Sequence, residues 1–176
     1  MLKENYLISI RGRQIVDEQS GEIEVTTLGS YVTKGNTRYI MYQEYDEDGG
    51  GSETSILKVE DNNCVTLMRG GADGTRLVLE KGRRHLCQYV TDAGQIMLGV
   101  FTSGMENTLG DDGGSVHVNY TLDLDANLSS FNEISITVKE ADKNHVKTRT
   151  GSDGAAAHGN PTGGGRRPAG GEAARG

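Results

Sequence analysis

The sequence has 176 residues, 34% of them hydrophobic, and carries a formal net charge of −7 at pH 7. The charge is unevenly distributed: residues 1–140 hold 12 basic and 22 acidic residues (a net of −10), and residues 141–176 hold six and three (a net of +3). Because an acidic domain repels phosphate backbones, we expect no nucleic-acid binding.

Composition divides the chain at the same point. Residues 141–176 contain both prolines and nine of the 26 glycines, with few side chains to bury, so we predict a disordered tail there. Residues 1–140 are long enough for one hydrophobic core and too short for two. We therefore predict a single folded domain over residues 1–140.

The two cysteines, Cys64 and Cys87, form no closely spaced pair and no disulfide framework. The N-terminal residues lack the apolar core of a signal peptide, and no run of about 18 apolar residues could span a membrane. We therefore expect a cytoplasmic protein with two reduced thiols and no membrane span.

Alternation of apolar and polar residues predicts a strand at residues 6–13 and a second strand that begins at Glu22. Gly29 interrupts the second strand and predicts a bulge or a sharp bend, after which the strand resumes at Tyr31. A third strand follows at residues 37–45. Both of its faces are partly apolar, which suggests that it has contacts on both sides.

Turn residues separate the strands that follow, which we predict at residues 54–59, 64–69, 75–80, 84–91 and 95–102. The glycine- and acid-rich segment up to Gly113 is expected to be a loop. Residues 114–139 show the most regular alternation of the chain and predict a final antiparallel pair of strands. Residues 125–132, between these two strands, have room for a single helical turn.

About ten short strands, joined by turn signals and without helical periodicity before residue 141, are typical of an antiparallel sandwich or barrel. The connections are too short for the crossovers of a parallel sheet. Closure removes exposed sheet edges, so we predict an all-β domain that forms one mostly up-and-down closed barrel of about eight to ten strands.

Four segments carry a family resemblance: ISIRGRQ (8–14), YQEYDEDG (42–49), MRGG (68–71) and VNYTLDLDANL (118–128). Together they resemble the YwiB-like family of uncharacterised bacterial proteins, over about residues 3–140. The family belongs to the calycin-like barrels, which include lipocalins and fatty-acid-binding proteins. The resemblance implies a closed barrel, and it brings no established activity and no site residues.

Two charged residues are predicted to point into the barrel. Glu44 shares its strand face with Ile40 and Tyr42, and Arg69 shares its face with apolar neighbours on residues 64–69. Because buried charges are costly unless they are paired, we predict a Glu44–Arg69 ion pair. Such a pair would anchor the head group of a ligand; the alternatives are a purely structural ion pair, or an Arg69 that reaches solvent from the end of its strand.

Gln88, Tyr120, Tyr42 and Tyr6 are further polar residues predicted to face inward, and with Glu44 and Arg69 they make up the candidate ligand-binding set. A barrel of this size is either filled by its side chains or holds one small ligand. The sequence leaves both possibilities open.

No motif indicates a cofactor. Asp46, Glu47 and Asp48 resemble part of a calcium loop, but strands flank them where helices are required. His85 and Cys87 share a strand face, but no second closely spaced pair completes a metal site. We therefore predict no metal and no other cofactor.

Three functions remain. The first is non-catalytic binding of a small, partly apolar ligand in the barrel lumen. The second is a filled barrel that binds either a protein partner or a second copy of itself through the outward residues Tyr39 and Met41 of the third strand. The third is a hydrolase with two carboxylates at the barrel mouth. No serine stands in a nucleophile elbow and few histidines are available as bases, so we do not expect an enzyme.

Overall fold

A computed structural model describes residues 3–142, which form ten strands and no helix. No helix that is long and apolar enough to cross a membrane occurs among these residues. The strands are β1 (Tyr6–Val16), β2 (Gln19–Lys34), β3 (Thr37–Tyr45), β4 (Ser52–Glu60), β5 (Cys64–Arg69), β6 (Thr75–Glu80), β7 (Arg84–Thr91), β8 (Gly94–Asn107), β9 (Gly113–Leu124) and β10 (Asn127–Glu140).

Each strand pairs with its neighbours in the sequence, all antiparallel, and β1 pairs with β10 to close the barrel. The predicted all-β, up-and-down closed barrel is therefore confirmed. The predicted disordered tail lies, from residue 143 onward, outside the described residues.

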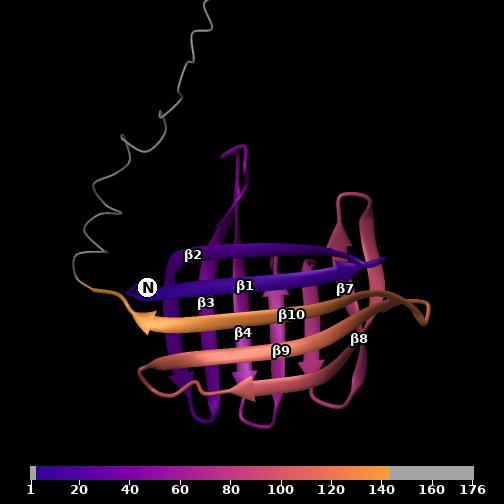
Figure 1. Cartoon of the computed structure of the whole chain (residues 1–176). Helices are drawn as coiled ribbons and strands as arrows, with labels where there is room; N and C mark the ends of the chain where they lie inside the picture. The colour runs from indigo at the N-terminus through magenta and orange to yellow at the C-terminus, as the bar shows by residue number, and fades with distance from the viewer. Residues whose placement is uncertain (1–2, 143–176) are drawn as a thin grey trace, which may run out of the picture. The chain divides into compact units, whose positions relative to one another are not determined.

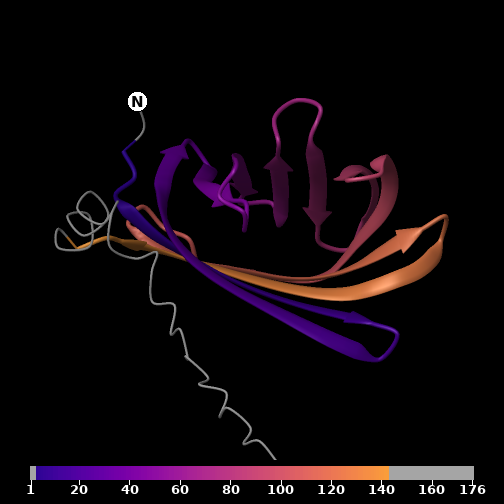
Figure 2. The same ribbon diagram turned by 90° about the horizontal axis from the view of Figure 1, so that it is seen from above.

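The barrel has a long wall and a short wall. In Figure 1 the first half of β2 and all of β1, β10 and β9 run horizontally across the front, while β3–β7 stand upright behind them. Seen from above, the β1–β2 and β9–β10 hairpins project beyond β3–β6 (Figure 2). The inner surface of these two hairpins therefore extends past the strands of the opposite wall, β3–β6.

Two ends of the barrel follow from the strand directions. The upper end of Figure 1 carries the connections at residues 46–51, 70–74 and 92–93. The lower end carries the connections at 35–36, 61–63, 81–83 and 108–112. The names upper end and lower end refer to these two sets of connections.

β2 belongs to both walls, because it bends at Gly29. Its first half pairs with β1, and its pairing with β3 starts where Gly29 stands opposite Tyr42. A Cβ atom on Gly29 would lie 2.4 Å from the Met41 carbonyl oxygen and 2.9 Å from Ile8 Cγ1. The predicted bend is therefore present, within one continuous strand, and only glycine fits there.

The connection between β9 and β10 differs from the prediction. Asp125 and Ala126 have φ values of 51° and 63°, and β10 begins at the next residue. Two residues with positive φ make a tight hairpin, which matches the twist of long paired strands better than a helical turn would. The helical turn predicted at residues 125–132 is wrong. β8 also continues through Asn107, into the segment predicted to be a loop.

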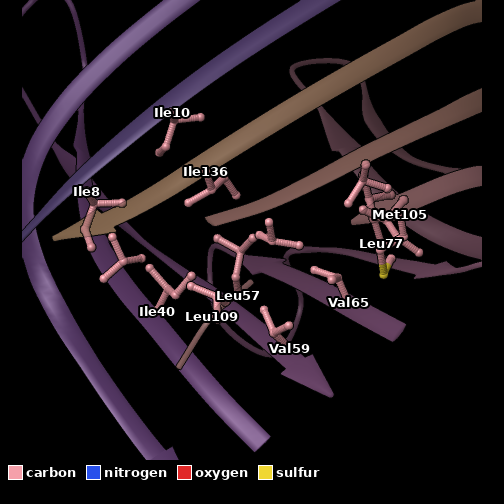
Figure 3. Packing of buried hydrophobic residues seen from close by; sticks show 14 of the residues in the cluster. Ile8, Ile10, Ile40, Leu57, Val59, Val65, Leu77, Met105, Leu109 and Ile136 are labelled. Atoms are coloured by element: carbon pink, nitrogen blue, oxygen red, sulfur yellow. The ribbon is translucent and has the colours of Figure 1, made fainter. Parts of the chain in front are cut away.

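The core lies between the two walls. Ile8, Ile10 and Ile136 of the long wall face Ile40 and Leu57 of the short wall (Figure 3). These five side chains are at most 6% exposed. Burial of such side chains contributes roughly 1.5–3 kcal/mol each, so this layer is what holds the walls together.

Candidate functional site

The inner surface of the short wall changes from apolar to polar toward the upper end. Near the lower end, Val59, Val65 and Leu79 stand in one row across β4, β5 and β6, and all three are at most 3% exposed. The corresponding row near the upper end consists of Ser55, Arg69 and Thr75. Burying a polar side chain inside a barrel costs free energy unless the side chain is hydrogen-bonded. The hydrogen-bond and ion-pair partners of these residues therefore define the candidate site.

Arg69 binds two carboxylates at the upper end. Its Nη2 atom lies 2.6 Å from Glu44 Oε2, and its Nε atom lies 3.1 Å from Glu53 Oε2. The predicted Glu44–Arg69 pair is therefore confirmed. The Arg69 side chain is 47% exposed, so the pair stands at the rim of the barrel and not deep in the lumen.

Ser55 and Tyr42 lie below this pair. The fully buried Ser55 donates a hydrogen bond of 2.7 Å from Oγ to Glu44 Oε1. Burial raises the pKa of Tyr42 well above its ordinary value, and the nearby Glu44 carboxylate raises it further. Tyr42 therefore stays a neutral hydrogen-bonding group at every physiological pH.

The long wall borders the upper end with uncovered apolar side chains. Val25 of β2 stands opposite the buried Ile10, and Ile23 stands opposite Gly12, so both face the barrel interior. Ile23 is nevertheless 64% exposed and Val25 is 44% exposed. Ile96 of β8, opposite Tyr89, also faces inward and is 37% exposed.

The first half of β2 is also a free sheet edge. Residues 19–27 pair with β1 on one side, and within the described residues no strand pairs with them on the other, since β3 starts its pairing at Gly29. Their unpaired backbone N–H and C=O groups therefore line the upper end next to Ile23 and Val25.

The lower end is closed by contrast. Leu109, in the connection between β8 and β9, is 7% exposed and belongs to the core. Tyr31 Oη donates a hydrogen bond of 2.6 Å to the carbonyl oxygen of Gly110 in the same connection. Arg38, inward-facing on β3, lies 2.8 Å from Asp61 and has only 15% of its side chain exposed.

The connections of the two ends also differ in charge. Those at the upper end contain five acidic residues (Asp46, Glu47, Asp48, Asp73, Asp92) and no basic one. Those at the lower end contain three acidic residues (Asp61, Asp111, Asp112) and two basic ones (Lys81, Arg83). The upper end thus combines an acidic rim with an uncovered apolar surface.

Gln88 corrects one prediction. Its neighbour Cys87 is 3% exposed and belongs to the core, whereas Leu86 is 65% exposed, so Gln88 lies on the outer face. There Gln88 Nε2 donates to the carbonyl oxygens of Asp73 and Gly74. β7 is apolar on both faces, which is why alternation alone chose the wrong one.

Tyr6 and Tyr120 face inward as predicted but lie apart from the Glu44–Arg69 pair. The Tyr6 ring packs edge to face on Tyr31, with centroids 5.3 Å apart. Burial, with a smaller contribution from Tyr89, raises the pKa of Tyr120 to about 12. Of the six predicted residues, the structure therefore brings together Tyr42, Glu44 and Arg69.

Comparison with known proteins gives the family. The model of a domain of unknown function, DUF1934, matches residues 8–136. The chain belongs to the DUF1934 family. It is also similar to the crystal structure of the ywiB protein from Bacillus subtilis, with a TM-score of 0.67 and 22% identity over 78% of this chain and 92% of that chain. No curated protein matches the chain.

Together, the two matches confirm the predicted YwiB-like family, and the 22% identity to ywiB shows a shared fold. The family description gives no activity.

Sequence reasoning missed two features of this DUF1934 barrel. Arg38 points inward, as its alternation with Ile40 and Tyr42 could have indicated. The exposure of Ile23 and Val25 had no sequence signal, because it depends on how far the short wall reaches across the long one.

Histidines and thiols are engaged in separate contacts. His85 Nε2 lies 2.7 Å from Glu80 Oε2, and His117 Nε2 lies 3.4 Å from Glu133 Oε1. Burial raises the pKa of the Cys87 thiol, whose sulfur accepts a hydrogen bond from the Val78 backbone N–H. Within residues 3–142, no group of three or more His, Cys, Asp or Glu side chains is arranged to hold a metal ion.

Proposed function

We propose that this protein is a non-catalytic binding module that takes an amphipathic ligand at its upper end. The observation that carries the proposal is the exposure of the inward-facing Ile23, which is 64% exposed although Ile8, Ile10 and Ile136 on the same face of the long wall are buried in the core. Uncovered apolar surface beside a few polar groups is characteristic of ligand sites.

The chemistry of the site favours a ligand with a cationic part. Arg69 already binds both Glu44 and Glu53, so it has little left to offer a carboxylate. The adjoining connections add five acidic residues and no basic one. A cation would be attracted by this field, and its apolar part would cover Ile23 and Val25.

This proposal shifts the binding site predicted from the sequence, which was deep in the lumen, to the rim. The 18 buried side chains of the core cluster occupy the interior between the walls. The cytoplasmic location expected from the reduced thiols is retained as part of the proposal.

A hydrolase with two carboxylates is less well supported. Glu44 and Glu53 do stand opposite each other, on β3 and β4. The guanidinium group of Arg69 binds both, however, and occupies the position that a substrate would need between them.

Binding of decyltrimethylammonium, a cationic amphiphile, tests the proposal by calorimetry below its micelle concentration. Ile23→Ser should weaken binding by about tenfold, since covering one such side chain contributes roughly 1.5–3 kcal/mol. Leu86→Ser is the matched control, because Leu86 is 65% exposed but lies on the outer face. Equal losses in both variants, or no binding to the natural protein, would refute a site at the upper end.

A further inference from the structure

We infer that the occupant of the upper end is an extended segment of another protein, which adds to the free edge of β2 as a further strand and alternates basic with apolar residues. This inference rests on the proposed function and specifies the ligand. Three observations carry it. The first half of β2 has an unpaired edge, its inward residues are apolar while its outward residues are acidic, and the rows of charged side chains across β10, β1 and β2 end on carboxylates at that edge.

The unpaired edge is long enough for a strand. Residues 19–27 pair with β1 alone within the described chain, and residues 19–26 are all exposed. A backbone with free N–H and C=O groups is a template for strand addition, in which main-chain hydrogen bonds provide affinity. A small molecule would leave most of these groups without protein partners.

The two faces of the edge differ, and this fixes the pattern of the added strand. Ile23 and Val25 face inward and are largely exposed, while Glu22 and Glu24 face outward. Side chains on a strand alternate between faces. A strand that matches both faces therefore carries apolar residues at every second position and polar ones between them.

The charged side chains that lie side by side across the outer face of β10, β1 and β2 indicate which polar residues the added strand should carry. One row reads Glu133, Arg13 and Glu22 across β10, β1 and β2, so its charge alternates and ends on a carboxylate. In the next row Arg11 lies 3.1 Å from Glu24, which also ends the row at the edge. Opposite charges across a strand pair are favourable, so the next strand out should be basic.

There is room for long basic side chains beside this edge. A groove of about 640 Å³ follows the outer face and is lined by Arg11, Arg13, Glu22, Glu24, Glu133 and Ser135, together with Gly12 and Ile23. Lysine or arginine side chains could lie along this groove with their cationic heads at Glu22 and Glu24, both more than 60% exposed.

A second copy of the chain fits this edge less well. The outward residues of this edge are Ser20, Glu22, Glu24 and Thr26, which include no cation. Edge-to-edge pairing of two copies would therefore extend neither charged row, and residues 1–140 of both copies carry a net charge of −10, from 12 basic and 22 acidic residues.

Calorimetry with capped heptapeptides tests the inference on the full chain. The peptide Val-Lys-Val-Lys-Val-Lys-Val should bind, and a peptide of the same composition with its lysines in one block should bind about tenfold more weakly. The double variant Glu22→Gln, Glu24→Gln should bind the alternating peptide about fivefold more weakly than the natural protein does. Glu106→Gln, on the outer face of β8 and outside this groove, is the matched control and should change binding less than twofold.

Backbone methylation tests the strand pairing itself. One heptapeptide is N-methylated on its lysines and another on its valines, so each lacks the N–H groups of one strand edge. The two should differ in affinity by about tenfold, because one of them has lost its hydrogen bonds to β2. If both bind as well as the unmethylated peptide, strand addition is wrong.

The same titrations separate this inference from the proposed function. Binding of decyltrimethylammonium with the expected Ile23→Ser effect, but without peptide binding, would overturn the strand partner and leave the upper end as a small-molecule site. Absence of both kinds of binding would overturn both proposals. The inference would also be overturned if Leu86→Ser weakens peptide binding and Ile23→Ser does not. That result would place the peptide on the outer face.

Discussion

The two ends of this barrel are built from the same strands but differ in how well their inward side chains are covered. At the lower end, the connection that holds Leu109 and Gly110 folds over the core, and Val59 and Val65 are almost fully buried. At the upper end, Ile23 also faces the interior but is 64% exposed. The β1–β2 hairpin projects beyond β3–β6 (Figure 2), so burial in this fold depends on how far each wall extends as well as on strand face. Inward residues are therefore stabilising at one end and free to bind at the other.

Truncation of a large apolar side chain should show the largest difference between the two ends in the free energy of unfolding. Ile40→Ala removes a side chain with 0% exposure and should cost about 2–5 kcal/mol in the free energy of unfolding. Ile23→Ala should cost less than about 0.5 kcal/mol, because Ile23 is 64% exposed. Urea unfolding of both variants measures the difference, and equal costs would contradict the description of the upper end as uncovered.

A buried tyrosine should make stability depend on alkaline pH. The pKa of Tyr120 is raised from 10.0 to about 12 in the folded protein. A raised pKa contributes stability that is fully present below about pH 10 and is lost as the pH rises through about 12. Well above pH 12 this loss approaches about 3 kcal/mol.

Tyr120→Phe should remove this part of the alkaline loss, measured as the difference between the two unfolding curves from pH 9 to 12. Chemical denaturation at each pH gives the free energies. Parallel curves for the natural protein and Tyr120→Phe would show that Tyr120 titrates alike in the folded and unfolded chains, and the assignment of its burial would fail.

The bend of β2 should be sensitive to a single methyl group. Gly29→Ala places a Cβ atom 2.4 Å from the Met41 carbonyl oxygen, so it should cost about 1–3 kcal/mol in the free energy of unfolding. Gly21→Ala on the free half of the same strand meets nothing within 4 Å and should be close to neutral. Thermal unfolding compares them, and a neutral Gly29→Ala would mean that β2 does not need its tight corner.

The ion pair at the rim should have the smallest effect on stability. Arg69→Met leaves Glu44 and Glu53 opposite each other without their cation, but the 47% exposure of Arg69 limits the cost to about 1 kcal/mol or less. The loss should shrink at high salt and when Glu53→Gln is added. A loss of several kcal/mol in urea unfolding would show that the pair is part of the core, contrary to the comparison of the two ends.

Much of the fold could be predicted from the sequence, because strand alternation and turn residues are local signals. The alternation of Ile134, Ile136 and Val138 and the glycine at position 29 led to the barrel and its corner. Prediction failed where the local signal was ambiguous, as on β7, where Leu86 and Cys87 are both apolar and only the register with β8 decides between them.

The candidate site was predicted only in part. The Glu44–Arg69 pair followed from the cost of inward charges, and the structure contains it at 2.6 Å. Its place at the rim, the second carboxylate of Glu53 and the free edge of β2 depend on where β3 leaves β2 and on how far each wall extends. No single segment of the chain carries that information.

Ligand binding at the upper end can be located directly by amide chemical-shift mapping during a titration with decyltrimethylammonium. The largest shifts should fall on residues 19–28 of β2 and on Glu44, Ser55 and Arg69. Shifts that instead cluster on the connection at residues 108–112, or on the outer residues Leu86 and Met97, would contradict it.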